Sequence, residues 1–175
     1  SMGFILQLVF ACFAVAGEVI AMSMGLGFAS MIDPQNGVQT PVLSSYFVIV
    51  ATLIFLALNG HLVMIAMISE SFQTLPVGTQ WEGQASIGQL LVWASRTFSG
   101  AVLVALPALG AILMVNLTFS VITRAAPQLN IFAVGFPMTI MLGFIFLFFS
   151  LPSIFPQVDL LLSEGYALMR RIAGG

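Results

Sequence analysis

Charged side chains are scarce in this chain of 175 residues. Asp, Glu, Lys and Arg together account for 6% of it, against about 25% in a typical soluble domain. Lysine is absent, and the four cations are all arginines. Because so few charges cannot cover a soluble fold, the composition predicts a surface that faces lipid or apolar protein. The net charge of −2 gives no indication of a nucleic-acid partner.

Residues for catalysis and metal binding are equally sparse. The chain has one cysteine, Cys12, and one histidine, His61, so it offers no internal disulfide and no set of metal ligands. No nucleophile–base pair and no phosphate-binding loop is recognisable. Cys12 lies in an apolar run, which is typical of a small buried hydrophobe. We therefore expect no enzyme activity, no cofactor and no metal.

Long apolar stretches dominate what is present. A helix needs about 20 apolar residues to cross the hydrocarbon core of a bilayer. Four stretches come close to this length: 3–24, 46–68, about 98–123 and about 132–151. They predict an all-α membrane protein built from hydrophobic helices and helical hairpins. Pro107 and Pro137 predict bends in the third and fourth helices.

Three connectors separate these stretches. Residues 25–45 are rich in glycine and turn residues, 69–88 are polar, and 124–131 form a short reversal that predicts a hairpin. After Pro152 the sequence predicts a separate amphipathic helix, at a membrane interface or on a partner. Three of the four arginines would then lie on one side of the membrane, which favours a cytoplasmic C-terminus.

Several polar residues interrupt the apolar stretches, namely Glu18, Asn59, His61, Arg96 and Asn116. We expect them to face protein or a water-filled path, because a charge at bilayer depth costs about 2.5–3.5 kcal/mol on insertion scales. For Glu18 the alternatives are a hydrogen bond to a neighbouring helix, a conduit lining and a proton relay. For His61 they are a packed histidine and a proton carrier. Arg96 would anchor a helix end at the headgroups, and the two asparagines would bridge helices.

The glycine-rich connector also carries bulky apolar side chains. Glycine permits backbone conformations that other residues avoid, and methionine adapts to irregular apolar surfaces. This combination suits a deformable plug that closes a pore, but it equally suits a loop folded back onto the protein. Composition does not separate the two. The candidate plug residues are Met24, Gly25, Leu26, Gly27, Phe28, Met31 and Ile32.

Three motifs resemble the FliR family of flagellar and type III secretion export gates. The first is GEVIAMSMGLGFASMIDP at 17–34. The second is LALNGH at 56–61, followed by SFQTLP at 71–76. The third and most specific is RAAPQLNIFAVGFP at 124–137, which fixes polar, proline and glycine positions. The motifs cover most of 17–137 and follow the order of the family.

This resemblance implies a division of the chain. Residues 1–97 would be FliP-like helices with a plug loop at about 24–40 and the polar connector 69–88. Residues 98–151 would be a FliQ-like hairpin, and 152–175 an amphipathic C-terminal tail. The family has a further hydrophobic portion ahead of the first motif, so we expect that an N-terminal portion is missing from this sequence.

The resemblance also implies partners and a location. It places the chain in a hetero-oligomer with FliP-like, FliQ-like and FlhB-like subunits, in the bacterial inner membrane at the flagellar basal body. Unfolded export substrates would pass through the centre, with Phe28 and Met31 as the leading occluding residues. Partner contacts would lie in the hairpin turn, at Arg124, Pro127, Gln128 and Asn130.

Two other functions compete with a protein-export gate. A small-solute transporter or channel subunit would be expected to show internal repeats with broken helices at matching positions, and the two halves show no convincing repeat. A purely structural scaffold would assemble the gate without closing it. Deletion of the plug segment distinguishes the scaffold from the gate.

Overall fold

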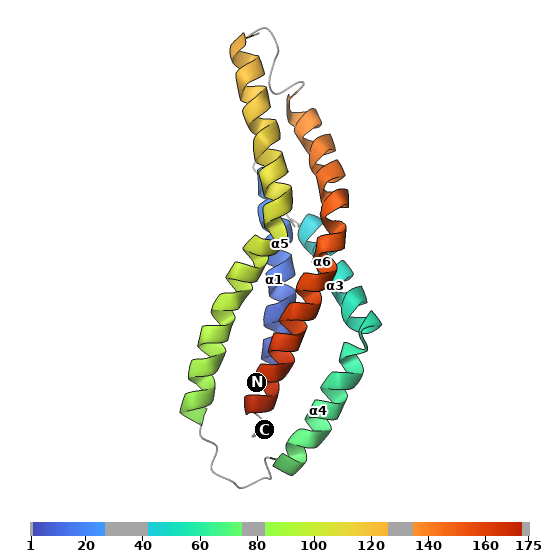
Figure 1. The fold of residues 1–175 in the computed structure, drawn as a ribbon, viewed down its shortest axis with the longest axis vertical. Coiled ribbons are helices and arrows are strands. Elements are labelled where there is room, and N and C mark those ends of the chain that lie inside the picture. The colour runs from blue at the N-terminus through green and yellow to red at the C-terminus, as the bar shows by residue number, and fades with distance from the viewer. Residues whose placement is uncertain (1, 27–41, 75–82, 126–134, 173–175) are drawn as a thin grey trace, which may run out of the picture.

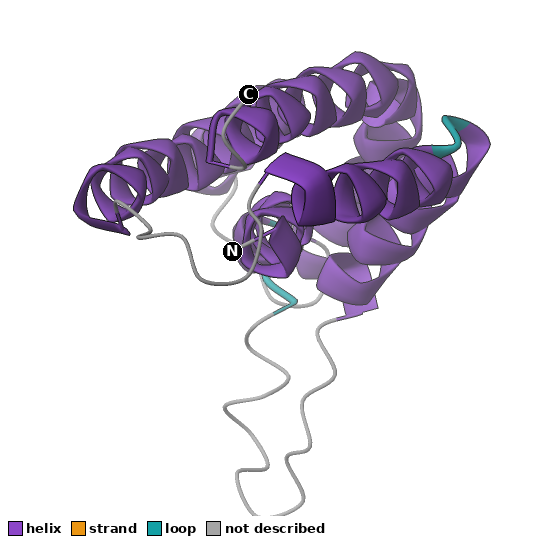
Figure 2. Ribbon diagram, turned by 90° about the horizontal axis from the view of Figure 1, so that it is seen from below, coloured by secondary structure: helices purple, strands orange, loops and turns teal. Residues whose placement is uncertain are grey.

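The described part of the chain is helical throughout. The computed structural model describes residues 2–26, 42–74, 83–125 and 135–172, with the side chains of 83–87 excepted. Within these ranges the helices are α1 (Met2–Ser23), α3 (Val42–Ala57), α4 (Gly60–Thr74), α5 (Gly83–Ala125) and α6 (Phe136–Ile172) (Figure 1). Figure 2 shows only helices and short turns in the described part of the chain. The prediction of an all-α membrane protein is confirmed.

Helix α1 is the centre of the bundle and packs against α3, α5 and α6. Its inward face is apolar and almost fully buried: Ile5, Val9, Cys12, Phe13, Ala16 and Ile20. Figure 1 shows the rest of the fold arranged around it, with the lower half of α5 and helix α4 diverging on opposite sides. The burial of Cys12 agrees with its interpretation as a small hydrophobe.

The crossing of α1 and α3 is tight because it is built on small residues. A Cβ atom at Gly17 would lie 2.7 Å from the Ser44 Cα and 2.8 Å from the Leu43 carbonyl oxygen, so only glycine fits there. Beside it, the Ser44 hydroxyl donates a hydrogen bond of 2.7 Å to the Ala14 carbonyl oxygen. Small residues and interhelical hydrogen bonds are the usual means of joining helices in membranes.

The predicted second helix is in fact two helices. The expected stretch 46–68 divides into α3 and α4, which are bent by 67° where they meet. The bend lies at Asn59, whose φ of 56° is left-handed. Its carbonyl oxygen accepts from the N–H groups of Leu62 and Val63 and so begins α4. Asparagine is one of the few non-glycine residues that tolerate this conformation, so Asn59 forms the bend instead of bridging two helices.

Helix α5 is longer than predicted, with 43 residues in place of the expected 98–123. It begins inside the predicted polar connector and runs through the predicted boundary at 97/98. Pro107 is inside α5, and Figure 1 shows the helix changing direction near its middle. Proline removes a helical hydrogen bond and clashes with the carbonyl one turn earlier, which accounts for the bend. Ala101, Ala105 and Ala108 are buried on the inward face.

Helix α6 contradicts the expected break after residue 151. It continues through Pro152 and Pro156 to Ile172. The apolar residues of the expected separate helix, including Val158, Leu161 and Leu162, are buried in the core of this chain. Pro137 is in the first turn of α6, where proline is tolerated, so the predicted bend there is wrong. The division into FliP-like, FliQ-like and tail portions stays a prediction.

Three of the helices can cross a membrane by length and composition, namely α1, α6 and the Gly88–Ala125 part of α5. The bent pair α3–α4 makes a fourth if it counts as one span. The four apolar stretches of the sequence therefore each produce helical structure of the expected character.

The α1–α3 crossing predicts that Gly17→Ala destabilises the protein by about 1–3 kcal/mol, the usual cost of overpacking a close contact. The measurement is the thermal unfolding of the detergent-purified chain, followed by circular dichroism. The matched control is Gly110→Ala, since a Cβ atom at Gly110 has no atom within 4 Å. It should be neutral or stabilising by up to about 1 kcal/mol. Equal effects of the two substitutions would contradict the tight crossing.

Candidate functional site

The first residues of the glycine-rich connector form a fixed end to α1. Gly25 has a φ of 82°. The Leu26 N–H donates to the Ala21 carbonyl oxygen and the Gly25 N–H to the Met22 carbonyl oxygen, both at 3.0 Å. These two bonds, together with a left-handed glycine, define the Schellman motif that ends many helices. Gly25 is therefore explained by helix termination, whereas the sequence suggested mobility.

Met24 is a core residue, with 1% of its surface exposed. It packs into a notch on α6 at Gly143, where a Cβ atom would lie 2.6 Å from the Met24 Cε. Leu26 is half-buried against the same core. The connector is thus anchored to α6 at its beginning. The other predicted plug residues, Gly27, Phe28, Met31 and Ile32, lie outside the described residues.

The bend between α3 and α4 is held by a residue from α6. The Tyr166 hydroxyl donates a hydrogen bond of 3.3 Å to the Gly60 carbonyl oxygen. A Cβ atom at Gly60 would clash with the Phe55 ring and would lie 2.7 Å from the Tyr166 hydroxyl. His61 follows immediately and is exposed. Tyr166 was not among the predicted site residues, because nothing in the sequence connects it with a bend more than 100 residues earlier.

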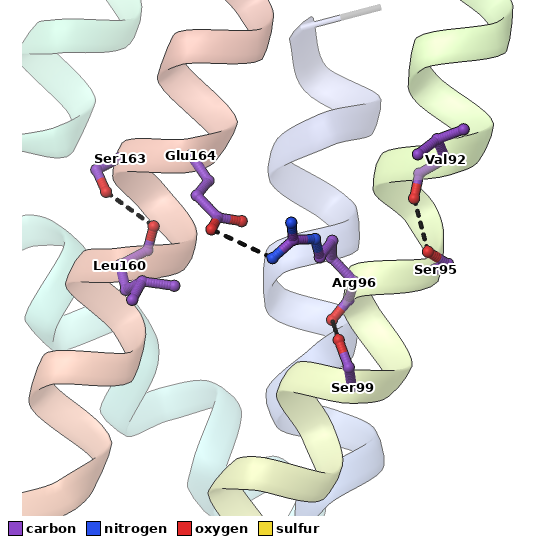
Figure 3. Close-up of polar contacts among 7 residues, drawn as sticks. All are labelled: Val92, Ser95, Arg96, Ser99, Leu160, Ser163 and Glu164. Carbon is purple, nitrogen blue, oxygen red and sulfur yellow. Dashed lines mark hydrogen bonds and ion pairs between the residues drawn. The ribbon is translucent and has the colours of Figure 1, made fainter.

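Arg96 forms an ion pair with Glu164, and it is the one ion pair within the described ranges 2–26, 42–74, 83–125 and 135–172. Figure 3 shows the two side chains pointing toward each other from α5 and α6, in front of α1. The nearest nitrogen and oxygen are 3.6 Å apart, and the side chains are 62% and 35% exposed. Arg96 lies well inside α5, whereas the sequence predicted an anchor at a helix end. Glu164 was not predicted as a site residue.

The remaining predicted polar residues are dispersed. Glu18, His61 and Asn116 are all exposed on the chain by itself. Among the described residues no hydrogen bond or ion pair joins any two of them, and no group of three His, Cys, Asp or Glu side chains lies close enough to hold a metal. Arg124 is exposed in the last turn of α5. Pro127, Gln128 and Asn130 lie outside the described residues.

Two buried polar atoms on α5, the Trp93 Nε1 and the Thr97 Oγ1, have no hydrogen-bond partner within the described part of the chain. They are one helical turn apart on α5. The indole of Trp93 packs beside Gly165 of α6. Buried polar groups without partners are rare in native proteins.

Large apolar side chains cover the outward faces of α5 and α6. On α5 they extend from Leu91 to Ile122, about 46 Å along the helix. On the hairpin half of α6 they include Met138, Met141, Phe144, Ile145, Phe148 and Phe149. The hydrocarbon core of a bilayer is only about 30 Å thick. Exposed polar residues interrupt the face of α5 at Ser95, Arg96 and Ser99 and again at Asn116, Thr118 and Ser120, so its continuous apolar part from Val102 to Met114 is within the reach of one bilayer. Large exposed apolar faces of this kind mark contacts with lipid or with other proteins.

These features define a class: a helical membrane protein with broken and bent helices and with large exposed apolar faces. Comparison with known proteins identifies the family. The family model of bacterial export proteins, family 1, matches residues 1–165. The chain belongs to this family of bacterial export proteins.

Individual relatives agree with this assignment. The flagellar biosynthetic protein FliR of Escherichia coli (strain K12) is 36% identical over 172 residues, which are 98% of this chain and 66% of the relative. FliR of Aquifex aeolicus (strain VF5) is 38% identical over 154 residues, or 88% and 59% of the two chains. The surface presentation of antigens protein SpaR of Shigella flexneri is 29% identical over 164 residues, or 93% and 63%. The chain thus spans slightly less than two thirds of these relatives.

The Schellman motif predicts that Gly25→Ala destabilises the protein by about 1–2 kcal/mol, because an L-residue is strained in the left-handed region. Gly25→Asn should have a smaller effect, because asparagine tolerates this conformation better. Thermal unfolding of the two variants in detergent measures the difference. Equal stability of wild type and Gly25→Ala would show that the glycine is not held at positive φ.

Proposed function

We propose that this chain is a subunit of the flagellar type III protein export gate and forms part of the wall of the conduit for unfolded export substrates. The observation that carries the proposal is the chain's membership of a bacterial export family, together with its likeness to proteins named flagellar biosynthetic protein FliR. The large apolar side chains exposed on α5 and α6 fit contacts with neighbouring subunits or with lipid.

The neighbours are FliP-like and FliQ-like subunits, with an FlhB-like subunit at the assembly. The α5–α6 hairpin would dock against a FliQ-like neighbour through the turn that contains Arg124, Pro127, Gln128 and Asn130. The exposed apolar residues of its two helices, such as Leu113 and Phe148, supply the side-by-side contact. The assembly lies in the bacterial inner membrane at the flagellar basal body.

The connector would act as the plug of the closed gate, with Phe28 and Met31 as the occluding side chains. Its support is the composition of 24–40 together with the anchored start at Met24 and Gly25. Because Met24 is buried and Gly25 ends α1, the part that closes the conduit begins after Leu26.

Native mass spectrometry tests the gate function. The full-length protein, co-expressed with its FliP and FliQ and extracted in mild detergent, should appear in one large complex that holds a single copy of this chain. A monomer, or a homo-oligomer without both partners, would contradict the proposal and favour a small-solute transporter or channel.

The plug is tested separately within the assembled complex. Replacing Phe28, Met31 and Ile32 together by serine should increase the ion conductance of membranes that contain the gate, because polar side chains no longer seal an apolar constriction. The matched control replaces Leu62, Ile65 and Ile68, which are exposed on α4, by serine. Unchanged conductance in an intact complex would favour a scaffold without a plug.

A further inference from the structure

The exposed face of α5 is apolar in its middle and carries polar residues on both sides, at Asn116, Thr118 and Ser120 toward the hairpin turn and at a second group toward its N-terminus. Between Val102 and Met114 every exposed residue is apolar or glycine. Toward the N-terminus of the helix, Gln89, Ser95, Arg96 and Ser99 are exposed among the apolar side chains. The transition from polar to apolar exposed residues therefore lies between Ser99 and Val102.

Helix α6 changes character at the same level, in the opposite chain direction. From Phe136 to Phe149 all of its exposed residues are apolar. Its charged residues, Asp159, Glu164, Arg170 and Arg171, come after Phe155. Gly100 of α5 and Leu161 of α6 lie side by side in the bundle, because a Cβ atom at Gly100 would lie 3.3 Å from Leu161. Ser95, Arg96 and Ser99 of α5 and Glu164, Arg170 and Arg171 of α6 therefore lie on the same side of this contact, away from the hairpin turn.

The ion pair at the centre of this polar region is loosely made. A single nitrogen–oxygen contact of 3.6 Å joins Arg96 and Glu164, whereas a charge-assisted hydrogen bond is about 2.7–2.9 Å. The guanidinium group has five N–H donors, and most of its surface is exposed. Within the described residues no hydrogen bond joins the guanidinium group to the hydroxyl of Ser95 or Ser99, and these hydroxyls donate to the carbonyl oxygens of Val92 and Arg96 of their own helix.

We propose that this polar strip, defined as Ser95, Arg96, Ser99 and Glu164, faces water in the assembled protein and is not covered by lipid tails or by an apolar helix. A charged pair with so few bonds is costly in an apolar environment and inexpensive in water. The strip lies on the α5–α6 side of the molecule, and α4 on the other side exposes Leu62, Ile65 and Ile68 together with His61, Ser69 and Glu70. The proposal does not depend on which substrate the assembly carries.

Cysteine accessibility tests the proposal in the full-length protein within its complex in native membranes. Single cysteines replace Ser95 and Ser99 in a Cys12→Ala background and are treated with a charged, membrane-impermeant thiol reagent from each side of the membrane. They should react at least about tenfold faster than cysteines at Leu106 and Leu113, because only a hydrated thiol forms the reactive thiolate. Protection of both serine positions from both sides would overturn the proposal.

The strength of the ion pair gives a second, independent test. If the strip faces water, Arg96→Gln should change the ratio of folded to unfolded protein by less than about fivefold in a denaturant titration of the purified complex. If the pair is covered by apolar groups, Arg96→Gln leaves Glu164 charged without a partner and the change exceeds about 100-fold. Arg96→Lys, which keeps the charge, is the matched control. A large loss for Arg96→Gln with recovery in Arg96→Lys would overturn the proposal.

Discussion

The close contact of α1 with α3 at Gly17 is the constraint on which the rest of the structure depends. Because no side chain separates the two backbones, α1 is held at the centre and presents its apolar residues to α5 and α6 at the same time. The same preference for small residues recurs where α5 meets α1 and α6, at Gly100, and where α1 ends on α6, at Gly143. Without a hydrophobic driving force between helices in lipid, such close approaches are the main source of specific packing.

Much of the fold could be predicted from apolar length alone, and the errors have a common cause. Residues 83–88 contain glycine, serine and glutamine and belong to the predicted connector 69–88, yet they form the start of a helix whose Leu90 and Trp93 pack against the core. Pro152 and Pro156 suggested a break, but Ile154 and Val158 on either side are buried, and packing keeps the helix continuous. In each case tertiary contacts, which are not visible in a local pattern, outweighed local preference.

The candidate site was less predictable than the fold. Polar residues in apolar helices could be recognised because placing them in a bilayer costs free energy. The pairing of Arg96 with Glu164 could not be predicted, since the two residues are distant in sequence and meet only when α5 and α6 fold against α1. Asn59 was recognised as unusual, but its left-handed backbone depends on Phe55, Gly60 and Tyr166 meeting at one point. Gly25 carried a readable signal, since glycine just after an apolar helix is the usual C-terminal cap.

The hydrogen bond from Tyr166 to Gly60 has a consequence for biosynthesis. Helices α3 and α4 have 16 and 15 residues, so each alone is shorter than a bilayer crossing. The Tyr166 hydroxyl that contacts the first turn of α4 at Gly60 is 106 residues further along the chain. This contact between α6 and the bend can therefore form only after the last helix has been synthesised.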